Sequence, residues 1–272
     1  MSKGKNKEIN QFEQRFSEDI IEIVAVTGPS GVGGGKAGGD TLWRASIGLV
    51  AWRELTSSNH AVIQEEKRLE WLADDQGLKE AREWLNKDCI VKLAVRRGEN
   101  SFMLVEVLDG GFHDIELEAL RDELQEPVYY NDEKLGTFTL DRSVQTFAKP
   151  IVWANEEGIL YFDHDESEEM TAALVTAHML FEDELKWSDS IRNFAADELV
   201  ELANDWLADS EDAELDEITK DIFISKLELS SISVSANGDF TIYYNDGDMF
   251  WGHVIIVEGN VNGTFDSAYI AG

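Results

Sequence analysis

The sequence is poor in cysteine, in proline and in long apolar runs. Its single cysteine, Cys89, cannot form an internal disulfide, so we expect a reducing compartment. It has only three prolines, and none belongs to a proline-rich linker. No stretch approaches the roughly 18 consecutive apolar residues of a membrane-spanning helix, and no apolar signal segment follows the basic N-terminus. These absences predict a cytoplasmic protein that does not bind or cross a membrane.

Basic residues are also scarce, because 23 Lys and Arg stand against 55 Asp and Glu, a net charge of −32. Phosphate contacts need clustered Lys and Arg, so we expect no nucleic-acid partner. A hydrophobic fraction of 43%, with eight tryptophans, predicts a folded protein despite the charge. The imbalance is concentrated: residues 136–272 hold 29 acidic and 6 basic residues, against 26 and 17 in residues 1–135. A basic protein partner is therefore expected to bind the C-terminal half.

The first half has patterns of both strands and helices. Polar residues 1–10 are expected to be frayed, and 60–76 has a loose helical spacing. A Gly-Glu-Asn turn at 98–100 between two apolar runs indicates a hairpin, and Asp114 is placed to cap a helix. The predicted strands are 19–27, 42–55, 89–97 and 101–109, and the predicted helices are 78–85 and 114–125.

The second half repeats the order of strands, helices and strands. Residues 135–142 and 150–165 read as strands, the latter a hairpin, and 168–185 and 188–210 as helices, the second capped by Ser188 or Asp189. Residues 218–229 read as a short helix running into a strand. A β-meander then follows, with turns at 237–238, 246–247 and 262–263. We therefore predict an α+β fold of antiparallel sheets packed with helices, in two domains, 1–127 and 128–272.

The glycine-rich segment 28–40 invites a nucleotide-binding interpretation. A phosphate loop requires G-x-x-x-x-G-K-[ST] before a helix, but Ser30 stands at the first glycine position and Ala37 follows Lys36. The following segment also reads as a strand, so no helix N-terminus faces a phosphate. A flexible loop is the favoured interpretation. Binding of an anion or another ligand remains the alternative, and its candidate residues are Gly28, Gly31, Gly33 and Lys36.

Acidic clusters offer candidates for cation binding. The run 163–169 fails the pattern of an EF-hand loop, because Glu168 stands where glycine is required. It is better explained as acids near a helix N-terminus. Glu198, Glu201 and Asp205 fit the solvent face of the long helix. Cys89 fits a buried strand rather than a reactive thiol, and no metal site or cofactor is predicted.

The C-terminal half resembles a known family. The residues that carry the resemblance are Leu135-Gly136 with Leu140-Asp141-Arg142-Ser143, then Ala203-Asn204-Asp205-Trp206, then Gly247-Asp248 with Phe250 and Gly252-His253. Over about residues 135–272 they resemble the bacterial domain of unknown function 2262. The resemblance implies a domain boundary and a bacterial cytosolic setting, without a known activity. It marks a candidate polar site: Arg142, Asn204, Asp205, Asp246, Asp248 and His253.

Three functions remain open. The leading one is a non-enzymatic, acidic protein-interaction module, comparable to an antitoxin or immunity protein, that covers a basic partner. The second is an enzyme or ligand-binding protein with its polar site around 247–253. The third is binding of a divalent cation. Asp246 and Asp248 are also ordinary turn residues, so local chemistry explains them without any ligand.

Overall fold

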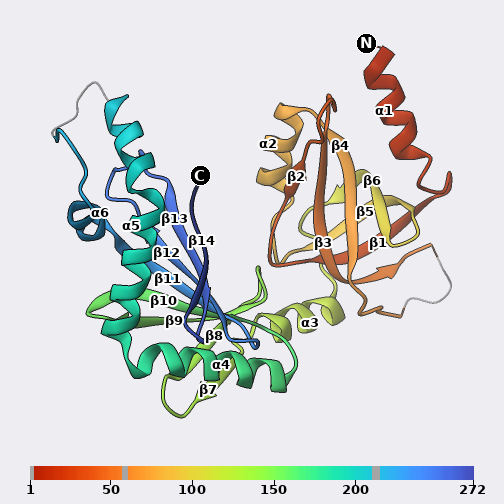
Figure 1. The fold of residues 1–272 in the computed structure, drawn as a ribbon. Helices are drawn as coiled ribbons and strands as arrows, with labels where there is room; N and C mark the ends of the chain where they lie inside the picture. Colours follow the sequence, from red (N-terminus) through yellow and green to blue (C-terminus); the bar gives the residue numbers. More distant parts are fainter. Residues whose placement is uncertain (1–2, 57–60, 210–214) are drawn as a thin grey trace. The chain divides into compact units, whose positions relative to one another are not determined.

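The computed structural model describes residues 3–56, 61–209 and 215–272, and the chain forms two compact units. The first unit comprises 1–126 with 142–144, and the second comprises 127–141 with 145–272. Each unit contains one β-sheet and helices, so the predicted α+β class is confirmed (Figure 1). No described helix is long and apolar enough to cross a membrane.

The first unit is a small barrel with three helices. Strands β1, β5, β6, β4 and β3 pair in this order, and β1 also pairs with β3, which closes the sheet. All pairs are antiparallel except β4 with β6. The elements are α1 (Lys3–Glu13), β1 (Ile20–Thr27), β2 (Gly33–Gly35), β3 (Trp43–Glu54), β4 (Lys67–Ala73), α2 (Asp75–Trp84), β5 (Ile90–Arg97), β6 (Ser101–Asp109) and α3 (Ile115–Gln125).

The order of the barrel strands follows a known scheme. Without β2, the five barrel strands follow along the chain as β1, β3, β4, β5 and β6. Around the barrel they lie in the order β1-β3-β4-β6-β5 and back to β1, that is first, second, third, fifth, fourth. The helix α2 connects the third of them to the fourth. This is the Greek-key arrangement of the OB-fold. A fold of this kind hosts many functions, so it assigns none here.

Alternating apolar residues fill the barrel. Leu69, Trp71 and Ala73 of β4 point inward, as do alternate residues of β3 and β5. The helices are fixed by capping and packing: Asp74 accepts a hydrogen bond from the Gly77 amide at the start of α2. On the outside of the barrel, Phe12 of α1 belongs to a small separate cluster.

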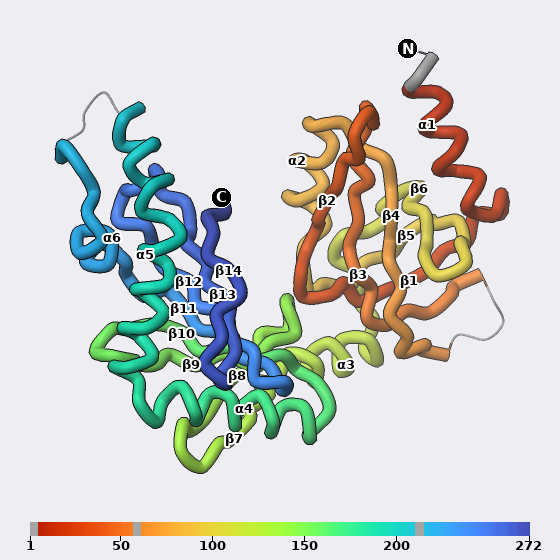
Figure 2. Tube along the Cα trace, in the orientation of Figure 1, coloured from red at the N-terminus to blue at the C-terminus, as the bar shows by residue number. Residues whose placement is uncertain are grey.

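Three expectations for this unit are wrong. Residues 60–76 contain the strand β4 instead of a helix, because the inward alternation of 69, 71 and 73 fits a strand paired on both sides. The glycine-rich segment is not wholly a flexible loop, since β2 pairs with β3 (Figure 2). The helix α1 covers most of the segment expected to fray, although residues 1 and 2 lie outside the described residues.

The second unit has an eight-stranded sheet in the order β14-β13-β12-β11-β10-β9-β8-β7, antiparallel except for β10 with β11. Its strands are β7 (Tyr129–Asp132), β8 (Gly136–Asp141), β9 (Thr146–Trp153), β10 (Glu156–Asp163), β11 (Glu228–Val234), β12 (Asp239–Asn245), β13 (Val254–Asn260) and β14 (Thr264–Ala271). Its helices are α4 (Ser167–Glu182), α5 (Glu184–Ala208) and α6 (Lys220–Lys226).

One face of this sheet and the three helices share a single core. Buried residues of β8 to β13 pack with buried residues of α4, α5 and α6 (Figure 1). The long helix begins at Glu184, so neither Ser188 nor Asp189 is its cap. Ser188 is buried within α5 and accepts a hydrogen bond from Arg192. The predicted last helical residue, 210, lies outside the described residues. The core therefore fixes α5 firmly along the sheet.

Candidate functional site

The segment 246–253, between β12 and β13, is organised by hydrogen bonds to a buried carboxylate. Its first residue, Asp246, is only 4% exposed. The Asp246 carboxylate accepts hydrogen bonds from the amides of Phe250 at 2.6 Å, Gly252 at 3.1 Å and Asp248 at 3.2 Å. A buried carboxylate is stable when several backbone amides donate to it. Asp246 therefore organises the loop from within.

The same loop holds two non-glycine residues in the left-handed region. Asp248 has φ 65° and Trp251 has φ 56°. Such values are uncommon, and for a bulky residue they are a genuine outlier that the surrounding structure must enforce. Here the amides around Asp246 enforce them. The result is that Trp251 projects outward, with 63% of its surface exposed.

Trp251 extends an aromatic cluster at the C-terminal end of α5. Its ring centroid lies 4.7 Å from that of Trp206, which also contacts Phe250 at 5.7 Å and His253 at 5.2 Å. Trp206 is half-buried and Phe250 is fully buried. The exposed indole thus rests on a rigid aromatic support instead of standing free in solvent.

Exposed carboxylates adjoin this cluster in the chain. Asp197, Glu201 and Asp205 are exposed and spaced four residues apart, so they share one face of α5, but a helix of 3.6 residues per turn puts Asp197 on the side opposite Trp206. Lys220 also pairs with Asp197 at 2.5 Å. We therefore call Trp206 and Trp251, together with the exposed neighbours Asp205 and Asp248, the α5 surface. It combines an exposed aromatic ring with negative charge.

Two other predicted residues of this region serve the fold. The Asn204 side chain donates to the carbonyl of Ile218 at 2.9 Å and accepts from its amide at 2.8 Å, so it holds the segment before α6 against α5. His253 Nδ1 donates to the carbonyl of Phe250 at 2.6 Å, since a carbonyl oxygen can only accept. Of the predicted residues, Asn204 and Asp205 thus lie on α5 just before Trp206, and Asp246, Asp248 and His253 lie in the loop 246–253, where the His253 ring contacts Trp206.

Arg142 belongs to the first unit, whereas the other candidate residues belong to the second. It lies in the turn between β8 and β9, and its guanidinium is 3.3 Å from the Asp88 carboxylate. Sequence reasoning missed Trp206 and Trp251 as site residues. The available signal was a tryptophan between Phe250 and Gly252 in a turn-forming segment.

The predicted ligand loop of the first unit has its own internal partners. The Lys36 ammonium lies 4.9 Å from the ring centre of Trp43 and 3.6 Å from the Asp75 carboxylate. Trp43 in turn donates to Asp75 at 2.6 Å, and this hydrogen bond is the main cause of the lowered pKa of Asp75. The cation that would attract a phosphate is therefore partly neutralised within the fold.

The glycines of this segment serve the backbone. Gly28 donates to the Gly48 carbonyl at 2.7 Å, Gly31 has φ 69°, and Gly33 begins β2. At Gly34 a Cβ would lie 3.1 Å from Leu78, so β2 packs closely on α2. These backbone roles explain Gly28, Gly31 and Gly33 without a ligand.

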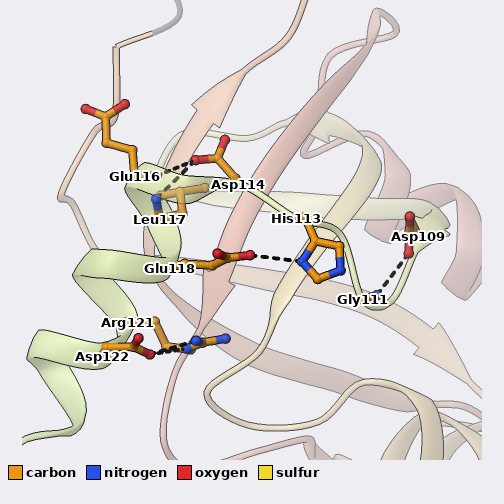
Figure 3. Close-up of polar contacts among 9 residues, drawn as sticks. All are labelled: Asp109, Gly111, His113, Asp114, Glu116, Leu117, Glu118, Arg121 and Asp122. Carbon is orange, nitrogen blue, oxygen red and sulfur yellow. Dashed lines mark hydrogen bonds and ion pairs between the residues drawn. The ribbon is translucent and has the colours of Figure 1, made fainter.

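A polar cluster surrounds Asp114, the residue that was expected to cap this helix, at the start of α3. Asp114 accepts from the amides of Glu116 and Leu117, and the exposed His113 lies 3.0 Å from Glu118 (Figure 3). Arg53 of β3 pairs with Asp114 at 3.0 Å. These contacts fix the beginning of α3. Among the described residues, no group of three or more His, Cys, Asp and Glu side chains could hold a metal ion.

Comparisons with known proteins cover both units. A family model described as an uncharacterised protein conserved in bacteria (DUF2262) matches residues 132–270. A second model, for a domain of unknown function (DUF7021), matches residues 8–124. No curated protein and no solved structure matches significantly.

Proposed function

This chain belongs to the DUF2262 family of uncharacterised bacterial proteins, and we propose that it is a binding module that takes a positively charged segment of another protein on the α5 surface. The exposure of Trp251 carries this proposal. An aromatic ring fixed in solvent on a rigid support is typical of an interface anchor. Its ring rests on Trp206 on one side, yet its strained backbone conformation leaves most of the side chain exposed.

The surrounding charge supports a basic partner. Arg or Lys side chains of the partner can lie over the indole face and pair with carboxylates such as Asp205 or Asp248, both of which are exposed. The excess of acidic residues in this half would also speed the encounter with a basic protein. A basic toxin is one such partner, which would make this chain comparable to an antitoxin or immunity protein.

The test uses a defined cationic probe. Calorimetric titration of the full chain with hepta-arginine is expected to show binding that weakens as salt rises, because exposed charges are screened. Trp251→Ala is expected to weaken it about threefold or more, the scale of a cation–π contact. Asp205→Lys is expected to weaken it about tenfold, by removing attraction and adding repulsion.

The matched control is Glu157→Lys, which makes the same charge change at an exposed position on β10. If hepta-arginine responded only to net charge, Glu157→Lys would weaken its binding as much as Asp205→Lys does. That result would refute the proposal. Absence of binding at low salt, or full binding by Trp251→Ala, would refute it as well. Circular dichroism of each variant shows whether the fold is intact.

A further inference from the structure

We infer that the first unit binds an extended, basic segment of a partner protein as an additional strand in the seam between β4 and β6. The parallel pairing of these two strands covers only Arg68–Glu70 against Ser101–Met103. Both strands continue beyond this ladder, β4 to Ala73 and β6 to Asp109. This inference uses a different surface from the α5 surface and stands independently of it.

Each strand has one free edge along the seam. The other edge of β4 is paired with β3 over its whole length, and the other edge of β6 is paired with β5 up to Asp109. Within the described part of the chain, no strand pairs with the seam edge of β4 after Glu70 or of β6 after Met103. Free edges are templates for strand addition, and main-chain hydrogen bonds then supply affinity.

The seam opens onto apolar side chains. A cavity of about 620 Å³ is lined by Trp71, Leu72, Trp84, residues 104–107 and Gly110. A second cavity of about 520 Å³ shares Trp71, Leu72, Trp84 and Leu104 with it and extends under α1. Because they share these four lining residues, we call the two adjoining cavities the β4–β6 groove. It can take the alternate side chains of an added strand.

The edge of the groove is unusually apolar for an exposed surface. Trp84, at the end of α2, is 42% exposed, and Val105 of β6 is 43% exposed. Val105 lies at an irregularity in the pairing of β6 with β5. A large exposed tryptophan beside an unpaired strand is typical of a binding surface. An added strand would cover both side chains.

Charge indicates the kind of segment. The carboxylates of Glu13, Asp74, Glu80 and Glu106 line the two cavities, and among the described lining residues Lys5 is the one basic side chain. Glu13 also pairs with Arg96 at 3.8 Å, so the other three carboxylates supply most of the negative charge. A segment with apolar residues at alternate positions and Lys or Arg between them would match both the apolar side chains and the carboxylates that line the groove. An acidic segment would be repelled.

The experiment selects peptides on the full chain from a phage-displayed random decapeptide library. The selected peptides are expected to alternate apolar residues with Lys or Arg and to lack proline. A synthetic peptide with a selected sequence is expected to slow hydrogen exchange at the amides of residues 104–108. Its affinity is expected to fall about tenfold or more in Trp84→Ala and in Val105→Lys, as for central interface residues.

The matched control is Ile115→Lys, which places the same base at an 88% exposed apolar position on α3. The control should bind the peptide as the unchanged protein does. The inference is overturned by a selection without enrichment, by selected peptides that are acidic or proline-rich, or by equal affinity in Val105→Lys and Ile115→Lys. It is also overturned if the chain is a dimer that Trp84→Ala dissociates, because a second copy then occupies the groove.

Discussion

Replacement of Asp246 by asparagine probes how the loop 246–253 is built, since it removes one charge at constant shape. The carboxylate accepts three amide hydrogen bonds, two of them on a single oxygen. Asparagine offers only one acceptor oxygen, so its NH2 group must face at least one of these donors. Hydrogen bonds to charged groups contribute about 1.5–3 kcal/mol each and neutral ones about 1 kcal/mol. With about 2 kcal/mol for the lost bond and about 0.5–1 kcal/mol for each of the two weakened bonds, the expected loss in the free energy of unfolding is about 3–4 kcal/mol.

Urea unfolding of the full chain, followed by circular dichroism, measures this loss. For a unit of this size, 3–4 kcal/mol corresponds to a fall in melting temperature of about 10 °C. The control is Asp248→Asn, because Asp248 is exposed and asparagine tolerates its left-handed backbone. Its expected change lies within about 0.5 kcal/mol. A loss below about 1 kcal/mol for Asp246→Asn, or equal losses for both variants, would refute the role of the buried carboxylate.

Three further outcomes follow from the same structure. Burial raises the pKa of Asp132, but the hydrogen bond from His178 and two backbone amides lowers it more, so the pKa lies below its ordinary 3.8. This carboxylate stabilises the fold above that value, and the stabilisation is lost as pH falls through the lowered pKa. In urea unfolding, Asp132→Asn should lower the free energy of unfolding by about 1–3 kcal/mol at pH 7 and by less at pH 3. Arg192→Met removes a buried guanidinium bonded to two carbonyls and a carboxylate, and should cost about 3–5 kcal/mol in the same assay. Gly259→Ala places a Cβ 2.7 Å from a backbone oxygen and should cost about 1–3 kcal/mol by thermal melting, whereas Gly33→Ala, with nothing within 4 Å, should be neutral.

Local chemistry predicted those elements whose determinants lie within a few residues. Asn237-Gly238 and Asn262-Gly263 form turns, with both glycines in the left-handed region, as the Asn-Gly signal indicates. Asp114 caps α3 as expected, because its carboxylate needs only the amides of the next turn. The class of fold follows from such elements.

Elements decided by distant pairing could not be predicted in this way. Three consecutive glycines have no intrinsic preference for a strand, and β2 exists because β3 lies beside it. In 60–76 the apolar residues fit a loose helical spacing, and only the neighbours β3 and β6 select the alternating one. The closure of the barrel by β1 and β3 is likewise a long-range property.

In the candidate site, too, local sequence predicted some features, and others depend on distant contacts. Asp246-Gly247 has the sequence of a tight hairpin turn, yet the carboxylate reaches amides four and six residues ahead and extends the connection to 253. Composition placed the acidic excess correctly on the C-terminal half, but could not show which tryptophan stays exposed. Exposure of Trp251 depends on its φ and on Trp206, neither of which the local sequence encodes.

The two proposed surfaces can be separated by their response to salt. In residues 136–272 only 6 basic residues face 29 acidic ones, so most carboxylates there have no cation within their own half. Attraction to a basic partner on the α5 surface therefore acts mainly between exposed charges, which salt screens over about 8 Å at physiological strength. The β4–β6 groove adds main-chain pairing and apolar burial to its charge contacts, and salt does not weaken these two contributions. A partner of the groove is thus expected to keep more of its affinity in high salt than a partner of the α5 surface.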